Sequence, residues 1–488
     1  MKTESLIKIY MYDSKKWFTV NVYRIVFCKQ ETSLAGLKVI YQEKINMLKR
    51  SALLLTVLAV VFAMFTSSAN AQNANAGIQV NAAGELKMNT VRDNSVKAIA
   101  LQARKALGSA ANETSEMRCV SLRALEKAIE ANNYALTEEM KYLAGLTRIE
   151  YVFFDQETKD VIIAGPAENW VVYPELDRVV GIKSGRPVVR LEDLVAALRL
   201  YGPDGSDPTT IGCSIDPTAE GLARFQQYVR TVNPFRMSVP EIRNGMTSAI
   251  GNYNVRVDGV SPNTHFAKVL VEADYRMKLI GIGLENPPAG VRSFISAANA
   301  SDVAQNALCR WYFVPNYQCV KMSDDGNAIQ LVGQGVKLVG EDEVVAADGS
   351  RALTGGSQNP ASRTFTRSFT DRYEKVSMVS PVYAELRNLI DIAIVAAYMN
   401  QEGIFTKAEW TMPTLGDETK YSIETSSPLK YAPAACNVVS KGGRLMTPTG
   451  GGVQIQPQVA LNDENLVDND AKFAKVSPLP EGKWWWNN

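Results

Sequence analysis

The sequence is poor in the side chains that most catalytic and metal sites use. Its 488 residues include one histidine, His265, and six cysteines, none of them in a Cys-X-X-Cys motif. A single histidine excludes a multi-histidine zinc site, and the missing motif excludes a zinc ribbon or a redox dithiol. Gly-X-Ser-X-Gly and Walker sequences are also absent. We therefore expect no metal and no cofactor, and the sequence leans against an enzyme.

Long apolar runs are missing as well. The longest extends from Ala52 to Phe65, 14 residues, whereas a membrane-spanning helix needs about 20. Lys49-Arg50 precedes this run and the small residues Ser67 to Ala71 follow it, which is the layout of a secretory signal peptide. A membrane anchor is the alternative. We expect a signal peptide over residues 47–71 with cleavage after Ala71, and therefore export to the periplasm, cell envelope or medium.

The residues before Met47 do not fit a signal that acts at an N-terminus. We expect translation to begin at Met47 and residues 1–46 to be a spurious upstream extension; a genuine long n-region is the alternative. The first 71 residues hold ten Lys/Arg and four Asp/Glu, so leaving them out changes the net charge from +1 to about −5. Because nucleic-acid binding favours a basic surface, we expect no nucleic-acid partner.

The remaining chain changes character along its length. We expect a flexible leader at 72–91, an α/β region at 92–290, a β-rich region with one long helix at 291–403, and an irregular segment at 404–488 that ends in three tryptophans. The fold class is α+β, with N-terminal helices, β-hairpins and β-α units, then a mainly antiparallel segment. Because disordered tails are poor in aromatics, we expect the tryptophans to dock on the body or on a partner.

Two helices are predicted most clearly. Residues 380–401 begin with Ser-Pro, end before Gly403 and carry one apolar stripe. The segment around His265 has a strong apolar row that includes Phe266 and Leu270, and a weaker second row. A helix that is apolar on two sides is usually packed between other elements, so we expect the His265 helix to lie well inside the fold.

Strands and further helices follow from period and turn residues. Strand pairs are expected at 148–154 with 161–164, and at 179–183 with 187–190, and a loop at 351–363. Helices are expected at 191–201, 218–232 and 238–251, and strands at 210–215 and 253–257. Further strands are expected at 310–314, 319–322, 328–332 and 336–339, with a hairpin turn at Asp325-Gly326.

Several short motifs occur in one order that is familiar from a known family. The sequence His-Phe-Ala-Lys-Val-Leu-Val-Glu-Ala-Asp-Tyr-Arg-Met-Lys at 265–278 resembles the central signature of a bacterial exported family, the domain of unknown function numbered fifteen ninety-eight in that series. Gly-Pro-Ala-Glu-Asn-Trp at 165–170, Arg-Trp-Tyr-Phe-Val-Pro at 310–315 and Leu-Arg-Asn-Leu at 386–389 are also similar to its pattern. The resemblance covers most of the chain from about residue 95. It implies export but no activity, so it assigns no catalytic residue.

His265 is the natural starting point for a catalytic hypothesis. On its helical face lie Glu272 and Arg276, and Glu272 is about 10 Å away along the axis, too far to orient the imidazole. Any carboxylate partner must therefore come from another element. The non-catalytic alternative is a histidine that is hydrogen-bonded to nearby backbone, with Glu272 and Arg276 paired on the surface. His265, Glu272 and Arg276 form our candidate site edge.

Cysteines offer two further hypotheses. Gly212-Cys213-Ser214 lies at a strand-to-helix boundary, where a nucleophile elbow would sit, so a Cys213–His265 dyad is conceivable; a small core residue is the plainer interpretation. Cys309 and Cys319 flank Val-Pro-Asn and could face each other as a disulfide across a hairpin; buried, unpaired thiols are the alternative.

We favour an exported globular protein with a binding or structural role in the bacterial envelope, with an envelope protein or polymer as partner. The alternative is a hydrolase that uses His265 with Cys213 or a carboxylate.

Overall fold

The computed structural model describes residues 8–13, 16–21 and 73–488, apart from 175–176, 234, 300–306, 347–349, 354–358, 442–443 and 474. The expected signal peptide at 47–71 therefore lies outside the described residues. The chain divides into two compact units, Met1–Gln72 and Asn73–Asn488. In the first unit, β1 (Lys8–Asp13) pairs antiparallel with β2 (Lys16–Asn21). All further elements belong to the second unit.

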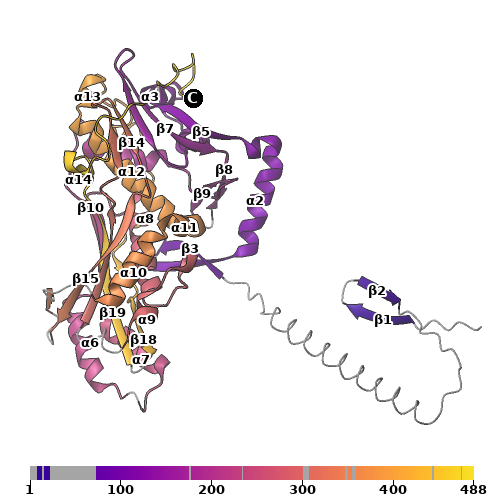
Figure 1. The fold of residues 1–488 in the computed structure, drawn as a ribbon, viewed down its shortest axis with the longest axis vertical. Coiled ribbons are helices and arrows are strands. Elements are labelled where there is room, and N and C mark those ends of the chain that lie inside the picture. Colours follow the sequence, from indigo (N-terminus) through magenta and orange to yellow (C-terminus); the bar gives the residue numbers. More distant parts are fainter. Residues whose placement is uncertain are drawn as a thin grey trace, which may run out of the picture. The chain divides into compact units, whose positions relative to one another are not determined.

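The second unit has the predicted α+β fold, with two larger sheets (Figure 1). The first sheet has eight strands in the order β16-β15-β12-β19-β10-β11-β17, with β18 paired to β19. Its strands are β10 (Ile211–Asp216), β11 (Tyr253–Asp258), β12 (Ala307–Pro315), β15 (Val336–Val345), β16 (Arg351–Leu353), β17 (Tyr431–Ala432), β18 (Cys436–Ser440) and β19 (Arg444–Ile455). Only the β12–β19 pair is parallel; the other pairs are antiparallel.

The second sheet has six strands in the order β13-β14-β6-β7-β5-β20. Its strands are β5 (Thr114–Ser121), β6 (Tyr151–Asp155), β7 (Asp160–Glu168), β13 (Val320–Met322), β14 (Ala328–Leu331) and β20 (Trp485–Asn487). The predicted turn at Asp325-Gly326 does join a hairpin, β13–β14. The strands expected at 310–339 are thus divided between the two sheets, because β12 and β15 pair in one and β13 and β14 in the other.

Most of the longer helices lie where the sequence patterns place them, and those expected at 191–201, 218–232, 238–251 and 380–401 agree with their predicted bounds to within one residue. The longer helices are α2 (Asp93–Leu107), α3 (Leu122–Ala131), α5 (Leu191–Tyr201), α6 (Ala219–Thr231), α7 (Val239–Ile250), α8 (His265–Gly281), α10 (Pro360–Asp371), α11 (Tyr373–Val379) and α12 (Pro381–Gln401). Short helices are α4 (Glu138–Lys141), α9 (Phe294–Ala297), α13 (Ile404–Lys407) and α14 (Pro457–Ala460). The exceptions are α10 and α11, which we did not predict: the expected loop at 351–363 contains β16 and the start of α10.

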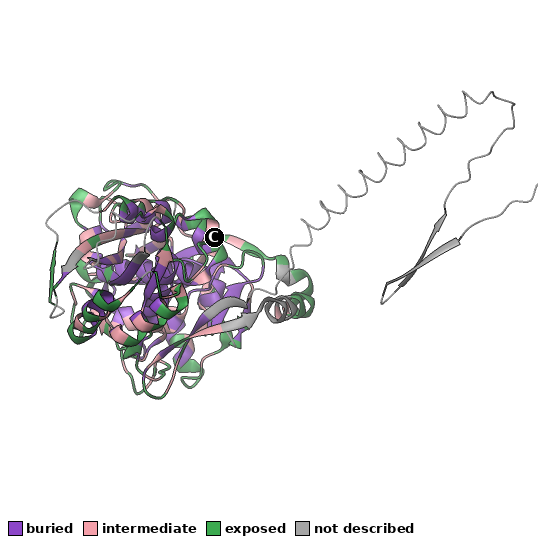
Figure 2. Cartoon of the chain, turned by 90° about the horizontal axis from the view of Figure 1, so that it is seen from below, coloured by how far each residue is buried: buried purple, intermediate pink, exposed green. Residues whose placement is uncertain are grey.

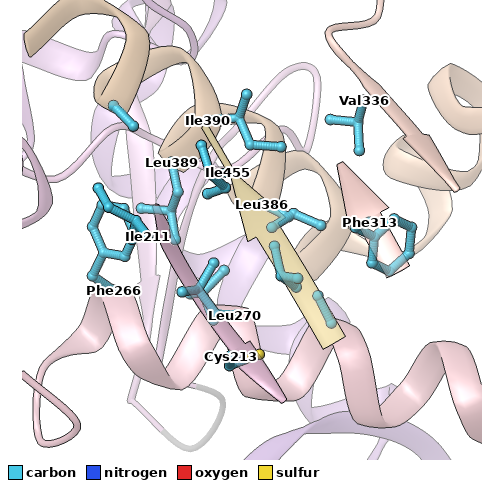
Figure 3. Packing of buried hydrophobic residues seen from close by; sticks show 14 of the residues in the cluster. Ile211, Cys213, Phe266, Leu270, Phe313, Val336, Leu386, Leu389, Ile390 and Ile455 are labelled. Atoms are coloured by element: carbon cyan, nitrogen blue, oxygen red, sulfur yellow. The ribbon is translucent and has the colours of Figure 1, made fainter. Parts of the chain in front are cut away.

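The His265 helix lies inside the fold, as predicted. Its first residue follows Thr264, whose hydroxyl accepts the Ala267 N–H at 3.3 Å and so caps the helix. Every residue from Val269 to Gly281 is buried, because α8 packs between the eight-stranded sheet and α12. Figure 3 shows Phe266 and Leu270 of α8 beside Ile211 and Cys213 of β10. α12 is buried from Val382 to Met399, so its apolar stripe is part of a helix that is enclosed on all sides.

One large hydrophobic core runs through most of the second unit, and two smaller clusters lie at β8–β9 and beside Trp486. The large core includes Ile78, residues of both sheets, α8, α12 and Trp484 near the C-terminus, and buried residues fill the interior in Figure 2. The predicted boundaries at 290 and 403 therefore do not separate cores. Among the described residues, no helix is long and apolar enough to cross a membrane.

Three further expectations need correction. The leader at 72–91 instead forms a hairpin of β3 (Asn73–Val80) and β4 (Leu86–Arg92), anchored by the buried Ile78 and Leu86. β9 (Arg178–Gly181) pairs with β8 (Trp170–Tyr173), and the predicted second strand at 187–190 makes only the bridge Val180↔Pro187.

The segment at 404–488 is the third correction, because it supplies β19 to the middle of the eight-stranded sheet. The run Gly450-Gly451-Gly452 lies within β19. A Cβ at Gly451 would lie 1.9 Å from the Trp311 carbonyl oxygen, and one at Gly452 would lie 1.9 Å from the Cys213 carbonyl oxygen. The glycines are required because β10, β19 and β12 approach one another too closely for side chains. The tryptophans dock on the body as expected: Trp485 and Trp486 pair with β5.

Candidate functional site

His265 is held by a carboxylate from another helix. Its Nδ1 lies 2.9 Å from Oδ2 and 3.1 Å from Oδ1 of Asp193, which is in the first turn of α5. The two side chains are 9% and 6% exposed. The partner does come from another element, as the helix geometry requires, and the bond to nearby backbone that we weighed as the non-catalytic alternative is replaced by this ion pair.

The Asp193 carboxylate also sets the protonation of the imidazole. Burial and the nearby Arg190 lower the pKa of His265, whereas the charge and the hydrogen bond of Asp193 raise it, and the net pKa is raised above its ordinary value. Because the folded state binds this proton more tightly than the unfolded chain, the pair stabilises the fold at low pH and loses that contribution as pH rises through the folded pKa. The arrangement is that of an interior ion pair between α5 and α8.

Cys213 does not join His265. Cys213 lies on the core face of β10, beside the middle of α8 (Figure 3). There the charges of Asp274 and Lys278 affect the pKa of its thiol. Asp274 is nine residues beyond His265, about 14 Å along the helix axis. Burial, followed by the charge of Asp274, holds the pKa of the Cys213 thiol well above its usual range. A protonated thiol is a poor nucleophile, so the structure does not assemble the Cys213–His265 dyad.

Glu272 and Arg276 belong to a buried ion network. Arg178 of β9 lies 2.5 Å from Glu272 and also contacts Glu385 of α12, while Arg276 lies 3.4 Å from Glu272 and 2.6 Å from Glu285. Glu272 and Arg276 are thus paired in the interior and not on the surface. The candidate edge His265, Glu272 and Arg276 faces β9, α5 and α12, and all three side chains are less than one-tenth exposed.

A second place in the structure is open to solvent. Residues 211, 213 and 215 of β10 face α8, so residues 212, 214 and 216 face the opposite side of the sheet. There an open groove of about 980 Å³ crosses β11, β10, β19, β12 and β15. We call it the β19 groove, because β19 runs along its centre. It is lined by Thr210, Gly212, Cys213, Ser214, Asp216, Pro217, Thr218, Ala219, Glu220, Asn254, Arg256, Asp258, Arg310, Tyr312, Glu341, Arg351, Val453 and Gln454.

Strand register arranges these groups in rows across the sheet. One row is Asn254–Asp216 on β11 and β10, then Gly450 of β19 beside Arg310, then Glu341 on β15. The next row is Arg256–Ser214–Gly452–Tyr312. In these two rows the middle strand contributes bare backbone, while polar side chains stand on both sides of it; Gln454 is the β19 side chain of the neighbouring row.

Asp216 is the centre of the groove's hydrogen bonding. Its Oδ2 accepts a hydrogen bond from Arg310 at 2.9 Å, and its Oδ1 accepts the Gly451 N–H at 3.1 Å and lies 3.7 Å from Arg351. Arg310 also lies over the Tyr312 ring, 5.1 Å from its centroid. Arg256 lies 2.8 Å from Asp258. Asp216, Arg310 and Arg351 therefore form one network at the centre of the groove, and Arg256 and Asp258 form a separate, exposed pair.

Residues 213–294 match the family model described as Protein of unknown function (DUF1598). The match confirms the predicted family resemblance over this segment, which runs from β10 through α8 to α9. No curated protein and no solved structure matches the chain. The DUF1598 segment carries His265, Glu272 and Arg276 as well as one wall of the β19 groove, including Ser214, Asp216 and Arg256. The other wall, with Arg310 and Tyr312, comes from outside the segment.

Sequence reasoning noticed several groove residues for other reasons. Ser214 belongs to the Gly212-Cys213-Ser214 segment considered as a nucleophile elbow, and Arg310 and Tyr312 belong to the family-like segment at 310–315. The signal that could have found the groove is a short alternation: Ser214 and Asp216 alternate with apolar residues in β10, and Arg310 and Tyr312 flank the apolar Trp311 in β12. The far wall could not be placed beside the DUF1598 segment because β19 joins them only through long-range pairing.

The cysteines do not form a redox site among the described residues. Cys309 of β12 and Cys319, which precedes β13, are free and buried, and they belong to different sheets, so the hypothesised disulfide is not formed. Burial raises the pKa of Cys319 to about 12 and that of Cys436 to about 11. The described part of the chain also contains no group of three or more His, Cys, Asp or Glu placed to hold a metal ion.

Proposed function

We propose that the chain is an exported binding protein of the bacterial envelope whose ligand lies in the β19 groove. The observation that carries this proposal is the contrast within single strands. Core-facing residues of β10 and β12 are enclosed by helices, while the intervening polar residues line an open groove that no described helix covers. A preorganised polar surface of this kind favours binding, because its side chains lose little further freedom when a ligand arrives.

The size of the groove favours an extended ligand. It crosses five strands, and neighbouring strands are about 4.8 Å apart, so it is roughly 19 Å wide across the strands. Three arginines and four acidic side chains line it. This balance speaks against a nucleic acid, which would need excess positive charge. An envelope polymer or a segment of an envelope protein fits both the length and the charge.

Blocking the groove tests the proposal. Ser214→Trp places an indole over the glycine floor, and Val172→Trp is the matched control, because Val172 of β8 is exposed on a different sheet. We expect the mature wild-type protein and Val172→Trp to co-sediment with isolated cell envelopes, and Ser214→Trp to stay in solution. If folded Ser214→Trp, checked by circular dichroism, sediments like the wild type, the groove is not the binding site.

Export is tested separately. The signal-like residues 47–71 support cleavage after Ala71, so N-terminal sequencing of the mature protein should begin at Gln72. An intact product in the cytoplasm that still carries residues 1–46 would overturn this part of the proposal.

A hydrolase that uses His265 is the second candidate, favoured by the 2.9 Å contact between His265 and Asp193. A carboxylate on Nδ1 is what orients a catalytic histidine. Hydrolysis of p-nitrophenyl acetate by wild type and His265→Gln separates the two candidates. Binding alone predicts no difference between them, whereas a His265-dependent hydrolase predicts a loss of activity in the variant of about a thousandfold.

A further inference from the structure

We infer that the ligand of the β19 groove is a neutral carbohydrate chain with free vicinal hydroxyl groups. This inference rests on the proposed function and names the ligand class of the same site. It depends on four features of the groove: its charge balance, its fork-shaped polar groups, its bare floor and the position of Tyr312.

The charge balance argues against an anionic ligand. Arg310 and Arg351 both approach Asp216, and Arg256 lies 2.8 Å from Asp258. Each arginine in the groove therefore already has a carboxylate neighbour. A phosphate or polyanion would have to compete with these carboxylates, and the further acids Glu220 and Glu341 in the lining would repel it.

A peptide strand fits no better. Addition of a strand to a sheet requires an exposed edge with unpaired backbone groups. The floor of the groove is the middle of the sheet, where β19 already pairs with β10 on one side and β12 on the other. Peptide side chains would also need apolar subsites, and the described lining is mostly polar.

The polar groups match hydroxyl pairs. Carboxylates, amides and guanidinium groups each present two donors or acceptors in one plane. Asp216, Asn254, Asp258, Arg256, Arg310 and Gln454 all line the groove. A carboxylate can accept hydrogen bonds from two adjacent hydroxyls of a sugar, a guanidinium can donate to two, and an amide can donate to one and accept from the other. A ligand rich in vicinal hydroxyls uses this lining more fully than any other neutral class.

The floor and the aromatic ring suit flat rings. Gly450 and Gly452 leave the backbone of β19 without side chains between the two walls. A pyranose unit is about as long as the spacing between strands, roughly 4.8 Å, so a chain lying across the sheet places about one unit on each strand. Tyr312, half-buried beside Gly452, offers the C–H face of one sugar an aromatic contact.

The test uses the same sedimentation assay with treated envelopes. Periodate cleaves vicinal diols. We therefore expect the wild-type protein to co-sediment with protease-treated envelopes but not with periodate-oxidised envelopes. Tyr312→Ala should bind untreated envelopes about tenfold more weakly. Tyr312→Phe should keep most of the affinity. Tyr317→Ala is the matched control, because Tyr317 lies outside the groove lining and stacks with Lys337.

The outcomes separate the two levels of the proposal. If protease abolishes sedimentation and periodate does not, the partner is a protein, the carbohydrate inference fails and the groove can still be the binding site. If periodate abolishes sedimentation but Tyr312→Ala binds as the wild type does, the inferred ring contact is overturned. If Ser214→Trp sediments normally, both the groove and the carbohydrate inference fail.

Discussion

Successive residues of β12 meet two different environments, and the contrast explains what the eight-stranded sheet does. Trp311 is fully buried, donates a hydrogen bond from Nε1 to the Ser362 hydroxyl at 2.9 Å, and packs on Phe365 with ring centroids 4.8 Å apart. Its neighbours Arg310 and Tyr312 face the β19 groove. The core face of the sheet packs closely against helices, whereas the groove face carries charged side chains that pair with one another. Substitutions on the two faces should therefore have very different costs.

The largest loss of stability is expected at Gly451, where the backbone of β19 lies against that of β12. Gly451→Val puts a side chain 1.9 Å from the Trp311 carbonyl oxygen, at a residue with φ of +117°. Pairing of β19 with β12 would be lost, and we expect destabilisation by more than about 4 kcal/mol, seen as insoluble protein or an early urea midpoint. Gly185→Ala is the control: φ is +71° but no atom lies within 4 Å, so about 1 kcal/mol is expected. Similar midpoints for both variants would contradict the close-approach argument.

A charged pair buried behind the sheet should come next. Asp274 and Lys278 of α8 form an ion pair with both side chains fully buried. Lys278→Met leaves Asp274 unpaired and should cost about 3–5 kcal/mol, whereas Asp274→Leu with Lys278→Met replaces both charges by apolar groups and should recover most of the loss. Urea denaturation measures both. A double variant as unstable as the single one would show that the pair is net stabilising.

The same pair gives a pH dependence. Burial, against the opposing charge of Lys278, raises the pKa of Asp274 to about 6, compared with about 3.9 in an unfolded chain. A raised carboxyl pKa means that the folded state gains stability when the group is protonated, so stability should fall as pH rises from about 4 to about 6. By linkage the change is on the order of 3 kcal/mol. The difference in the free energy of unfolding between the wild type and the double variant, measured from about pH 4 to about pH 6, isolates the contribution of Asp274. A difference that does not change with pH would contradict the prediction.

A smaller effect is expected at His265. In Asp193→Asn the burial and Arg190 that lower the pKa of His265 are no longer offset by Asp193, so its pKa should fall below that of the wild type. His265 is the only histidine, which makes a single imidazole titration by NMR unambiguous. We expect the variant to lose about 1–3 kcal/mol near pH 5 and less at pH 8. An unchanged pKa would mean that Asp193 does not control the imidazole.

The smallest effect is expected on the open face. Asn254 is exposed in the groove, and Asn254→Ala should change the free energy of unfolding by less than about 0.5 kcal/mol while weakening sedimentation with envelopes. Tyr253→Ala, one residue earlier and fully buried, should cost about 3–5 kcal/mol. Equal costs at the two positions would remove the distinction between the faces.

Local sequence patterns located most elements but few of their partners. The predicted ranges 191–201 and 380–401 correspond to α5 and α12, because helix caps and apolar spacing act within a few residues. The candidate site fared differently. The spacing of His265 and Glu272 excluded a direct contact, but nothing local indicated Asp193, which is 72 positions earlier. The β19 groove was not predicted because its glycine floor resembles a chain breaker.

The sequence by itself determined the α+β class, the buried setting of α8, the scarcity of catalytic side chains and the family resemblance confirmed at residues 213–294. These depend on composition and short-range periodicity. Only the tertiary structure decided that Gly450-Gly451-Gly452 runs through the middle of a sheet, that Cys213 and His265 stay apart, and that the open polar surface is the β19 groove. Such facts depend on pairing between strands that are hundreds of residues apart in the chain, and no local pattern specifies which strands will pair.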